Sequence, residues 1–149
     1  MSCWKESWRQ TYSDPLFCVA CNPNGSQIAT GTAKSFVWQS IIHLYNFEDK
    51  IETHTLSEVT QHCVGSICYS PDGKLLAIGA DDKTIRLYDN EINDVVMFQR
   101  CSDIIKRLSF TPDGCKLVAS LGSYKYIVID MKYPRKVKEY NVSAVSGIS

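Results

Sequence analysis

The sequence predicts an all-β protein made of repeated, four-stranded antiparallel sheets. The first observation is that short apolar runs, rich in β-branched and aromatic residues, alternate with compact turn signals. The second is that this order of runs and turns recurs at intervals of about 40 residues. Strands that alternate with tight turns pair as antiparallel hairpins, which gives the predicted type of sheet.

The clearest copy contains three strands joined by two turns. Residues 64–69 supply β-branched and aromatic side chains that suit a half-buried pleated surface. Ser70-Pro71-Asp72-Gly73 then predicts a tight turn, because proline fixes one dihedral, aspartate bonds the local backbone and glycine accepts a positive φ. Residues 75–78 are almost all apolar, as in a strand covered on both faces. After a turn at Asp81-Asp82-Lys83, residues 84–88 alternate in polarity and form the third strand.

The same order of elements appears twice more, once before and once after this stretch. The turn glycines Gly25, Gly73 and Gly114 are separated by 48 and 41 residues. The first copy carries about five extra residues before its third strand ends, and we place them within residues 33–38. A period of this length, filled with strands alone, predicts the blades of a β-propeller.

Taken together, these segments resemble the WD40-repeat family, and the resemblance covers roughly residues 15–149. The clearest copy contributes Ser70-Pro71-Asp72-Gly73, Asp82-Lys83-Thr84-Ile85 and Leu87-Tyr88-Asp89. Weaker matches are Thr111-Pro112-Asp113-Gly114, Ile129-Asp130, Asn22-Pro23-Asn24-Gly25 and Tyr45-Asn46. The resemblance implies a partial WD40-type β-propeller built from four-stranded antiparallel blades.

The repeat spacing divides the chain into an N-terminal segment and an incomplete propeller. The segment is 1–14, and the blades are predicted at about 15–58, 59–100 and 101–141, with the start of a fourth at 142–149. In that last part, Val145 and Ile148 repeat the spacing of Val64 and Ile67. Propellers typically have 4–8 blades, so we expect a truncated product. Its first and last blades would each expose an apolar face and promote self-association.

Many blades of the resembled family are tied together by a buried network of histidine, serine or threonine, aspartate and tryptophan. Aligned on the turn glycines, the second copy has Thr60, Ile78, Asp82 and Tyr88 at these positions. The third copy offers Cys101, Ser123 and Ile129. Because only Asp82 is retained, we expect apolar packing rather than linked hydrogen bonds to hold the blades. Asp82 and the three turn glycines are expected to be structural.

Composition and charge argue against several classes of partner. Lys plus Arg equals Asp plus Glu, 16 each, so no global field favours nucleic acid or anionic lipid. The basic segment 132–139 is interpreted as a solvated outer strand rather than a phosphate-binding patch, since edge strands commonly carry lysine. No stretch is long and apolar enough to cross a membrane, and the start lacks a signal-peptide core. Seven cysteines, an odd number, add to the prediction of an intracellular protein.

Catalysis and metal binding are not expected. Glycine-rich phosphate loops, nucleophile elbows and HExxH helices are absent from the sequence, and the three histidines are isolated from any nucleophile. Cys18-Val19-Ala20-Cys21 is a CxxC, for which zinc or redox chemistry is the alternative to burial as small hydrophobes. Residues three apart on a strand point to opposite faces, and no second CxxC completes a site. We therefore predict no enzyme activity, no metal and no cofactor.

The resemblance implies a non-catalytic scaffold or adaptor for protein–protein interactions. In the resembled family, partners dock mostly on one face of the disc, at the start of the innermost strand and beside the turn aspartate. The matching residues here are Phe17, Cys63, Gly65, Asp81, Ile104 and Lys106. For Phe17, docking of a partner and packing in the core both remain open. The alternative function is a truncated isoform or fragment of a larger WD40 protein that acts only by associating with other blades.

Overall fold

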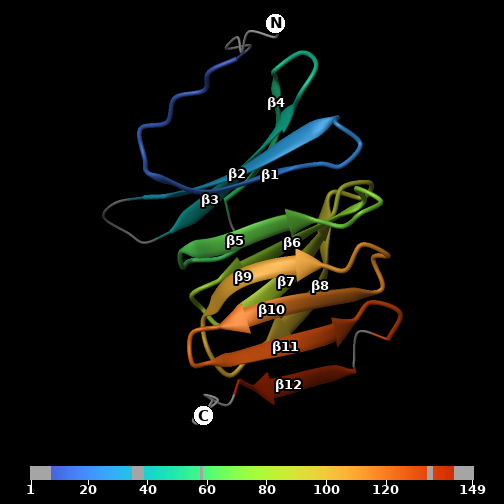
Figure 1. Ribbon diagram of the computed structural model, residues 1–149. Helices are drawn as coiled ribbons and strands as arrows, with labels where there is room; N and C mark the ends of the chain where they lie inside the picture. Colours follow the sequence, from blue (N-terminus) through green and yellow to red (C-terminus); the bar gives the residue numbers. More distant parts are fainter. Residues whose placement is uncertain (1–7, 35–38, 58, 134–135, 143–149) are drawn as a thin grey trace, which may run out of the picture.

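Twelve strands form three separate four-stranded antiparallel sheets in the described residues (Figure 1). The computed structural model describes residues 8–34, 39–57, 59–133 and 136–142. The strand orders are β1-β2-β3-β4, β5-β6-β7-β8 and β12-β11-β10-β9, so each sheet is a simple meander of consecutive strands. The predicted start of a fourth blade lies outside the described residues, apart from Val142.

The bounds of the strands in the first sheet are β1 Leu16–Cys21, β2 Gln27–Ala33, β3 Ser40–Asn46 and β4 Glu52–Leu56. Those of the second are β5 Val64–Tyr69, β6 Leu75–Ala80, β7 Thr84–Asp89 and β8 Asp94–Arg100. Those of the third are β9 Ile105–Phe110, β10 Lys116–Leu121, β11 Lys125–Asp130 and β12 Val137–Asn141.

The turn between the first two strands of each sheet has the geometry that its sequence predicts. Gly25, Gly73 and Gly114 have φ angles of 75°, 75° and 71°, where an L side chain is strained. Each glycine N–H donates to the carbonyl oxygen three residues earlier at 2.8 Å. In the second sheet, Asp72 also accepts bonds from the Ser70 hydroxyl at 2.6 Å and from the Lys74 N–H at 3.1 Å. These local bonds close the hairpin independently of the neighbouring sheets.

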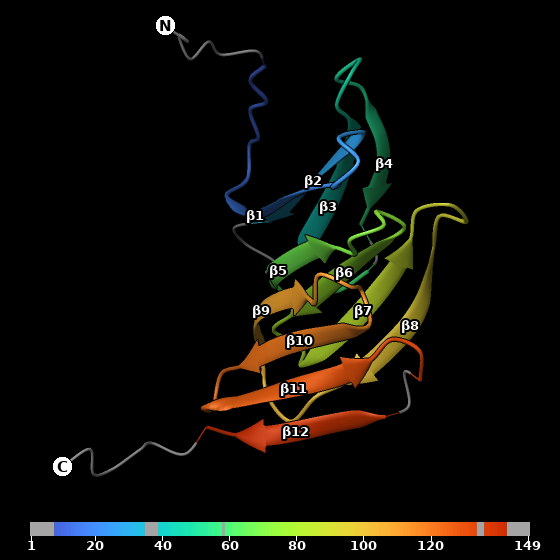
Figure 2. The same cartoon turned by 45° about the vertical axis from the view of Figure 1, so that its right-hand side comes forward.

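The three sheets stack face to face with the strands β1, β5 and β9 side by side, an arrangement of consecutive propeller blades (Figure 2). The first and second blades enclose one apolar core, whose larger members are Ile42, Leu44, Val64, Ile67, Leu76 and Ile78. The second and third blades enclose another, whose larger members are Ile85, Leu87, Ile105, Leu117, Ile127 and Ile129. The fold is therefore a partial β-propeller in which the blades are joined through two separate cores.

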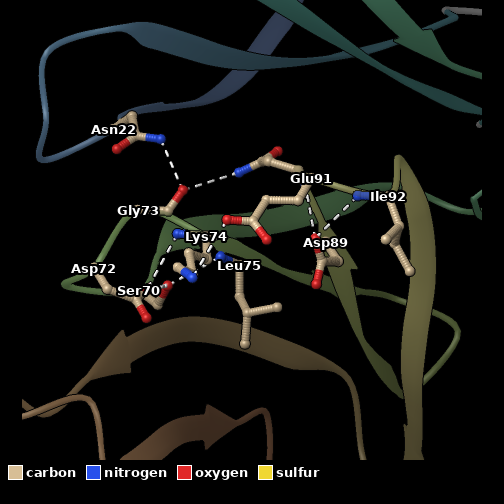
Figure 3. A network of polar contacts seen from close by, with 10 residues as sticks. Asn22, Ser70, Asp72, Gly73, Lys74, Leu75, Asp89, Glu91 and Ile92 are labelled. Atoms are coloured by element: carbon tan, nitrogen blue, oxygen red, sulfur yellow. Dashed lines mark hydrogen bonds and ion pairs between the residues drawn. The ribbon is translucent and has the colours of Figure 1, made fainter.

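A polar tie joins the first two blades at their turns (Figure 3). The buried Asn22, in the first turn, donates through Nδ2 to the Gly73 carbonyl oxygen at 2.9 Å. Asn90 donates to the same oxygen at 3.1 Å. A Cβ at position 73 would collide with the Asn22 side chain, so glycine at this position is required both for φ and for space.

The extra length of the first blade is spread more widely than the sequence suggested. Residues 34–39 connect β2 to β3, whereas residues 81–83 make the equivalent connection in the second blade. Strands β2 and β3 are each seven residues long, one more than β6 and β7. The insertion thus lengthens both strands as well as their connection, of which residues 35–38 lie outside the described part of the chain.

The outward face of the third blade differs from the bare apolar face that was expected. By alternation and register it carries Lys116, Val118, Ser120, Tyr126 and Lys138, together with Val128 and Tyr140. The equivalent positions on the buried face of the second blade are Leu75, Ala77, Gly79, Ile85 and Met97. Lys116 and Lys138 replace Leu75 and Met97, so this face is more polar than the buried face of the second blade, while Val118 and Val128 keep part of it apolar.

The outward face of the first blade is partly covered by the segment that precedes it. The ring of Trp8 lies edge-on to Tyr45, with a centroid distance of 5.5 Å. Tyr12 lies 5.3 Å from the ring of His43, and its hydroxyl is hydrogen-bonded to Thr30 Oγ1 at 2.8 Å. The expectation that this face is uncovered is therefore wrong for the part of it around Tyr45.

Candidate functional site

A β-bulge interrupts each of the three innermost strands at its second residue. The register shifts between Leu16 and Cys18 in β1 and between Val64 and Ser66 in β5. In β9 the same shift falls at Lys106, because Ile105 and Arg107 pair with consecutive residues of β10. A bulge turns its extra residue away from the ladder. Phe17, Gly65 and Lys106 are therefore re-aimed in the same way on neighbouring strands.

These three bulge residues line one groove, called here the bulge groove. It has a volume of about 360 Å³. The full lining is Phe17, Cys18, Val19, Gly65, Ser66, Ile67, Lys106 and Arg107. Because β5 lies between β1 and β9, glycine occupies the middle of the groove, with an aromatic side chain on one side and cationic side chains on the other.

Space in the bulge groove depends on Gly65. A Cβ at this position would lie 2.9 Å from the carbonyl oxygen of Ile105, a backbone atom that no rotamer change can move. A side chain here would push β5 and β9 apart as well as fill the groove. Glycine thus permits both the close approach of two blades and the open gap between Phe17 and Lys106.

The bulge groove has two chemically different ends. Phe17 is 55% exposed and Val19 is also exposed, so the core-packing alternative for Phe17 is wrong. Lys106 and Arg107 are both exposed, and within the described residues neither forms an ion pair. An aromatic end and a cationic end, separated by a gap, suit a ligand that carries an apolar group near a carboxylate.

Three other candidate residues lie at the strand ends rather than in the groove. The Asp81 N–H donates to the Cys63 carbonyl oxygen at 2.9 Å, and the Gly122 N–H donates to that of Ile104 at 3.1 Å. Cys63 is buried, and its thiol pKa is raised by burial and by the charge of Asp81. Asp81 is exposed and Ile104 half-buried. Of these three, Asp81 is therefore the side chain best placed to meet a partner.

Asp82 is the centre of a polar network that the sequence analysis underestimated. Its carboxylate accepts from Thr60 Oγ1 at 3.0 Å and from Arg86 Nη2 at 2.9 Å, and it also bonds the N–H and hydroxyl of Thr84. Burial raises the pKa of Asp82, but the bonds from Arg86, Thr84 and Thr60 outweigh it and lower the pKa. The expectation that only apolar packing holds the blades is wrong for the second blade.

Arg86 was missed although a local signal was present. Positions 82, 84 and 86 alternate onto one side of the chain, so the long side chain of Arg86 could have been assigned to Asp82. The guanidinium also lies over the ring of Phe98, 5.1 Å from its centroid. Arg86 therefore links the turn aspartate to the outermost strand of its blade.

The first blade has its own version of this network. The turn glycines Gly25 and Gly73 are 48 residues apart. Counting back from Thr60 and Ile78 by this spacing leads to Tyr12 and Thr30, which are hydrogen-bonded to one another. Tyr12 also lies 6.5 Å from the ring of Tyr45, at the end of the third strand. Extending the glycine alignment to the first copy would have identified this pair from the sequence.

The CxxC does not present two thiols on one face. Cys18 is half-buried against the second blade, whereas Cys21 is exposed. Burial raises the pKa of Cys18 to about 11. Across the described ranges, no group of three or more His, Cys, Asp or Glu side chains has the arrangement of a metal site. The same ranges contain no helix long and apolar enough to cross a membrane.

Comparison with known proteins agrees with this architecture. Residues 51–89 match the WD40 family, described as "WD domain, G-beta repeat". The chain is 28% identical over 128 residues to the WD repeat-containing protein 91 homolog of Dictyostelium discoideum, a match covering 83% of this chain and 16% of that protein. It is 27% identical over 131 residues to echinoderm microtubule-associated protein-like 4 of Xenopus laevis, covering 83% and 13%. The chain thus spans less than a fifth of the length of these two relatives.

A solved structure supports the fold. The "Kuenenia stuttgartiensis Hydrazine Synthase" chain superimposes with a TM-score of 0.76 at 15% identity, covering 94% of this chain and 40% of that one. At this identity the likeness concerns the fold alone. The repeated four-stranded blades define a β-propeller protein. Residues 51–89 match a WD40 repeat, and the chain as a whole is similar to WD-repeat proteins.

Proposed function

We propose that this chain is a non-catalytic, intracellular interaction scaffold that docks a protein partner in the bulge groove. The observation that carries the proposal is the set of three equivalent β-bulges, which bring Phe17, Gly65 and Lys106 together from three blades. Bulges that re-aim side chains are common next to functional sites. The residues that line this groove include no His, Asp or Glu.

The groove chemistry indicates what the partner presents. An exposed aromatic side chain beside a gap is typical of a binding hot spot, because docking removes it from water at little cost in side-chain entropy. Lys106 and Arg107 lie at the other end and have room for a carboxylate. A partner segment with an apolar side chain near an Asp or Glu would satisfy both ends of the groove.

The names of two relatives agree with a scaffold role. Rik1-associated factor 1 of Schizosaccharomyces pombe is 25% identical over 136 residues, and the echinoderm microtubule-associated protein-like proteins are similar over 83% of this chain. Each of these names records an association with another protein or assembly. For the present chain, association with protein partners is the corresponding proposal.

A combined Phe17→Ala, Asp81→Ala and Lys106→Ala variant tests the proposal. Affinity capture from cell extract, quantified by mass spectrometry, is expected to lose the partners that the unchanged chain retains, while circular dichroism stays the same. The matched control is Ile92→Ala with Lys116→Ala, which removes an exposed apolar side chain and an exposed cation outside the groove. Equal recovery of the same partners by both variants would contradict docking in the bulge groove.

A further inference from the structure

A second groove lies between the second and third blades, at the turns that follow β5 and β9. It is called here the turn groove, and it has a volume of about 490 Å³. Half-buried apolar side chains and two exposed carboxylates line it, and these residues are Leu75, Phe110, Met131, Asp72 and Asp113. The Leu75 side chain extends from the second blade toward the third (Figure 3). The bulge groove lies where the same two strands begin, so the two grooves occupy opposite ends of these strands.

The repeat places an equivalent hollow between the first and second blades, with a volume of about 340 Å³. In this hollow the amides of Asn22 and Asn90 both donate to the Gly73 carbonyl oxygen, so polar side chains occupy the space between the turns. By the spacing of the turn glycines, Asn22, Gln27 and Asn90 correspond to Ser70, Leu75 and Met131 in the turn groove. Three amide side chains are thus replaced by one hydroxyl and two apolar side chains.

The turn groove lacks the amide donors of the equivalent hollow. The single hydroxyl proton of Ser70 is donated to the Asp72 carboxylate at 2.6 Å, and Met131 has no polar hydrogen. In the described part of the chain, the Gly114 carbonyl oxygen therefore lacks both donors that its counterpart Gly73 has. The space beside Gly114 is also open, because the atom nearest to an added Cβ is Pro71 Cδ at 3.5 Å. A ligand with N–H donors can occupy this space.

The two carboxylates of the turn groove carry negative charge at neutral pH. In both turns, the hydroxyl two residues earlier and the N–H two residues later bond Oδ1, and these bonds lower the pKa of Asp72 and Asp113. Oδ2 of each carboxylate can accept from a ligand. Lys74 pairs with Glu91 at 3.3 Å, and Lys116 lines a separate hollow on the outward face of the third blade. The charge complementary to the turn groove is therefore positive.

We propose that the turn groove docks a second protein partner, through a segment in which an arginine adjoins an aliphatic side chain. The guanidinium has five N–H donors, enough to serve Asp72, Asp113 and the Gly114 carbonyl oxygen together. The aliphatic side chain packs on Phe110 and Met131. The same carboxylates repel nucleic acid and anionic lipid. Because the bulge groove carries cationic side chains, the two grooves select partner segments of opposite charge.

NMR titration of the whole, isotope-labelled chain with short peptides tests the proposal. The probes are glycine-flanked peptides whose central residues are leucine–arginine, leucine–glutamate or alanine–arginine, and the first is expected to bind most tightly. Asp72→Asn with Asp113→Asn should raise the dissociation constant of the leucine–arginine peptide about tenfold, the size expected from two exposed ion pairs. The matched control is Asp49→Asn with Asp94→Asn, which removes two exposed aspartates outside the groove and should leave binding unchanged.

A second variant tests the apolar part of the turn groove. Met131→Asn copies into it the amide that Asn90 provides in the equivalent hollow, and it should weaken binding of the leucine–arginine peptide because that amide reaches the Gly114 carbonyl oxygen. Circular dichroism of each variant separates a lost contact from a lost fold. The variant with alanine at Phe17, Asp81 and Lys106 should bind this peptide like the unchanged chain, so the two docking proposals stand or fall separately.

Four outcomes would overturn the proposal. The first is equal binding of the leucine–arginine and leucine–glutamate peptides. The second is a set of NMR shifts that lies outside the turns 70–75 and 110–116. The third is unchanged affinity in Met131→Asn or in the variant with both groove aspartates replaced. The fourth is displacement of the peptide by calcium chloride at an ionic strength where sodium chloride has no effect, which would identify a metal site in place of a docking site.

Discussion

Replacing Gly79 by alanine probes the contact between the second and third blades. Gly79 lies on β6 where β9 packs against it, and an added Cβ would collide with the Ile105 side chain. It would also lie 3.0 Å from the Ile105 Cβ and 3.1 Å from the Leu108 Cδ1. Since the Cβ of Ile105 is fixed to the backbone, no rotamer change relieves the clash, and the two blades must separate.

The expected cost is about 1–2 kcal/mol of unfolding free energy. Overpacking one methyl group in a filled core costs about 1–3 kcal/mol. Replacing glycine by alanine also lowers the conformational entropy of the unfolded chain, which offsets about 0.4–1 kcal/mol of this destabilisation. Ser120→Ala, at the equivalent position on the uncovered face of the third blade, is the control and is expected to change stability by less than about 0.5 kcal/mol.

Equilibrium unfolding in urea, followed by circular dichroism, measures both variants. A double-mutant cycle with Ile105→Ala sharpens the test, because Ile105 is fully buried and its truncation alone costs about 2–5 kcal/mol. In the double variant the methyl group added at position 79 occupies part of the space that the truncated Ile105 side chain vacates. The combined loss should therefore fall short of the sum by about 1 kcal/mol or more. Unchanged stability of Gly79→Ala, or strict additivity, would refute the packing of β9 on β6.

Two further predictions concern the polar network and the thiols. Asp82→Asn should cost about 2 kcal/mol near neutral pH, since it weakens the charged bonds to Arg86 and Thr60. The pKa of Asp82 in the folded protein is lowered from 3.8, so its stabilisation is present above that value and lost as the pH falls below it. Asp82→Asn should therefore remove this loss of unfolding free energy at acidic pH, and a variant whose stability in urea falls with pH as it does in the unchanged chain would contradict the prediction. Cys21 and Cys115 are exposed and should react with a thiol reagent at neutral pH. Burial raises the pKa of Cys18 to about 11 and of Cys68 to about 12, so Cys18 and Cys68 should react only after the protein unfolds. Elemental analysis should find no stoichiometric zinc, and one bound zinc per chain would favour zinc binding by the CxxC.

The turns could be predicted from the sequence because their causes are local. A glycine at positive φ and an aspartate that bonds the next residues lie within four positions, as at Asp72 and Gly73. That Phe17 and Lys106 lie on one face was predicted from the family resemblance and not from the local sequence around either residue. Each bulge depends on how a strand pairs with its neighbour, and this is set by tertiary packing.

The polarity of the outward faces could not be predicted from strand alternation alone. Alternation shows that Val118 and Ala119 point to opposite faces, but not which face meets the second blade. Comparison of equivalent positions in the second and third blades identifies the outward face, because Ser120 occupies the position at which the second blade needs Gly79 to pack against β9. The Asp82 network was underestimated for a different reason. The expected partners were sought at fixed positions of the resembled family, whereas Arg86 reaches the carboxylate from another position.

The meander topology has a consequence for synthesis on the ribosome. Each sheet is made of four strands that are consecutive in the chain, and none borrows a strand from a distant segment. A blade can therefore complete its hydrogen bonding once its own 40 or so residues have emerged, without waiting for the C-terminus. The first core closes when β5–β7 follow the first blade, well before β9 is made. Nascent chains released after β8 would keep the first core intact and expose the face of the second blade that β9 normally covers.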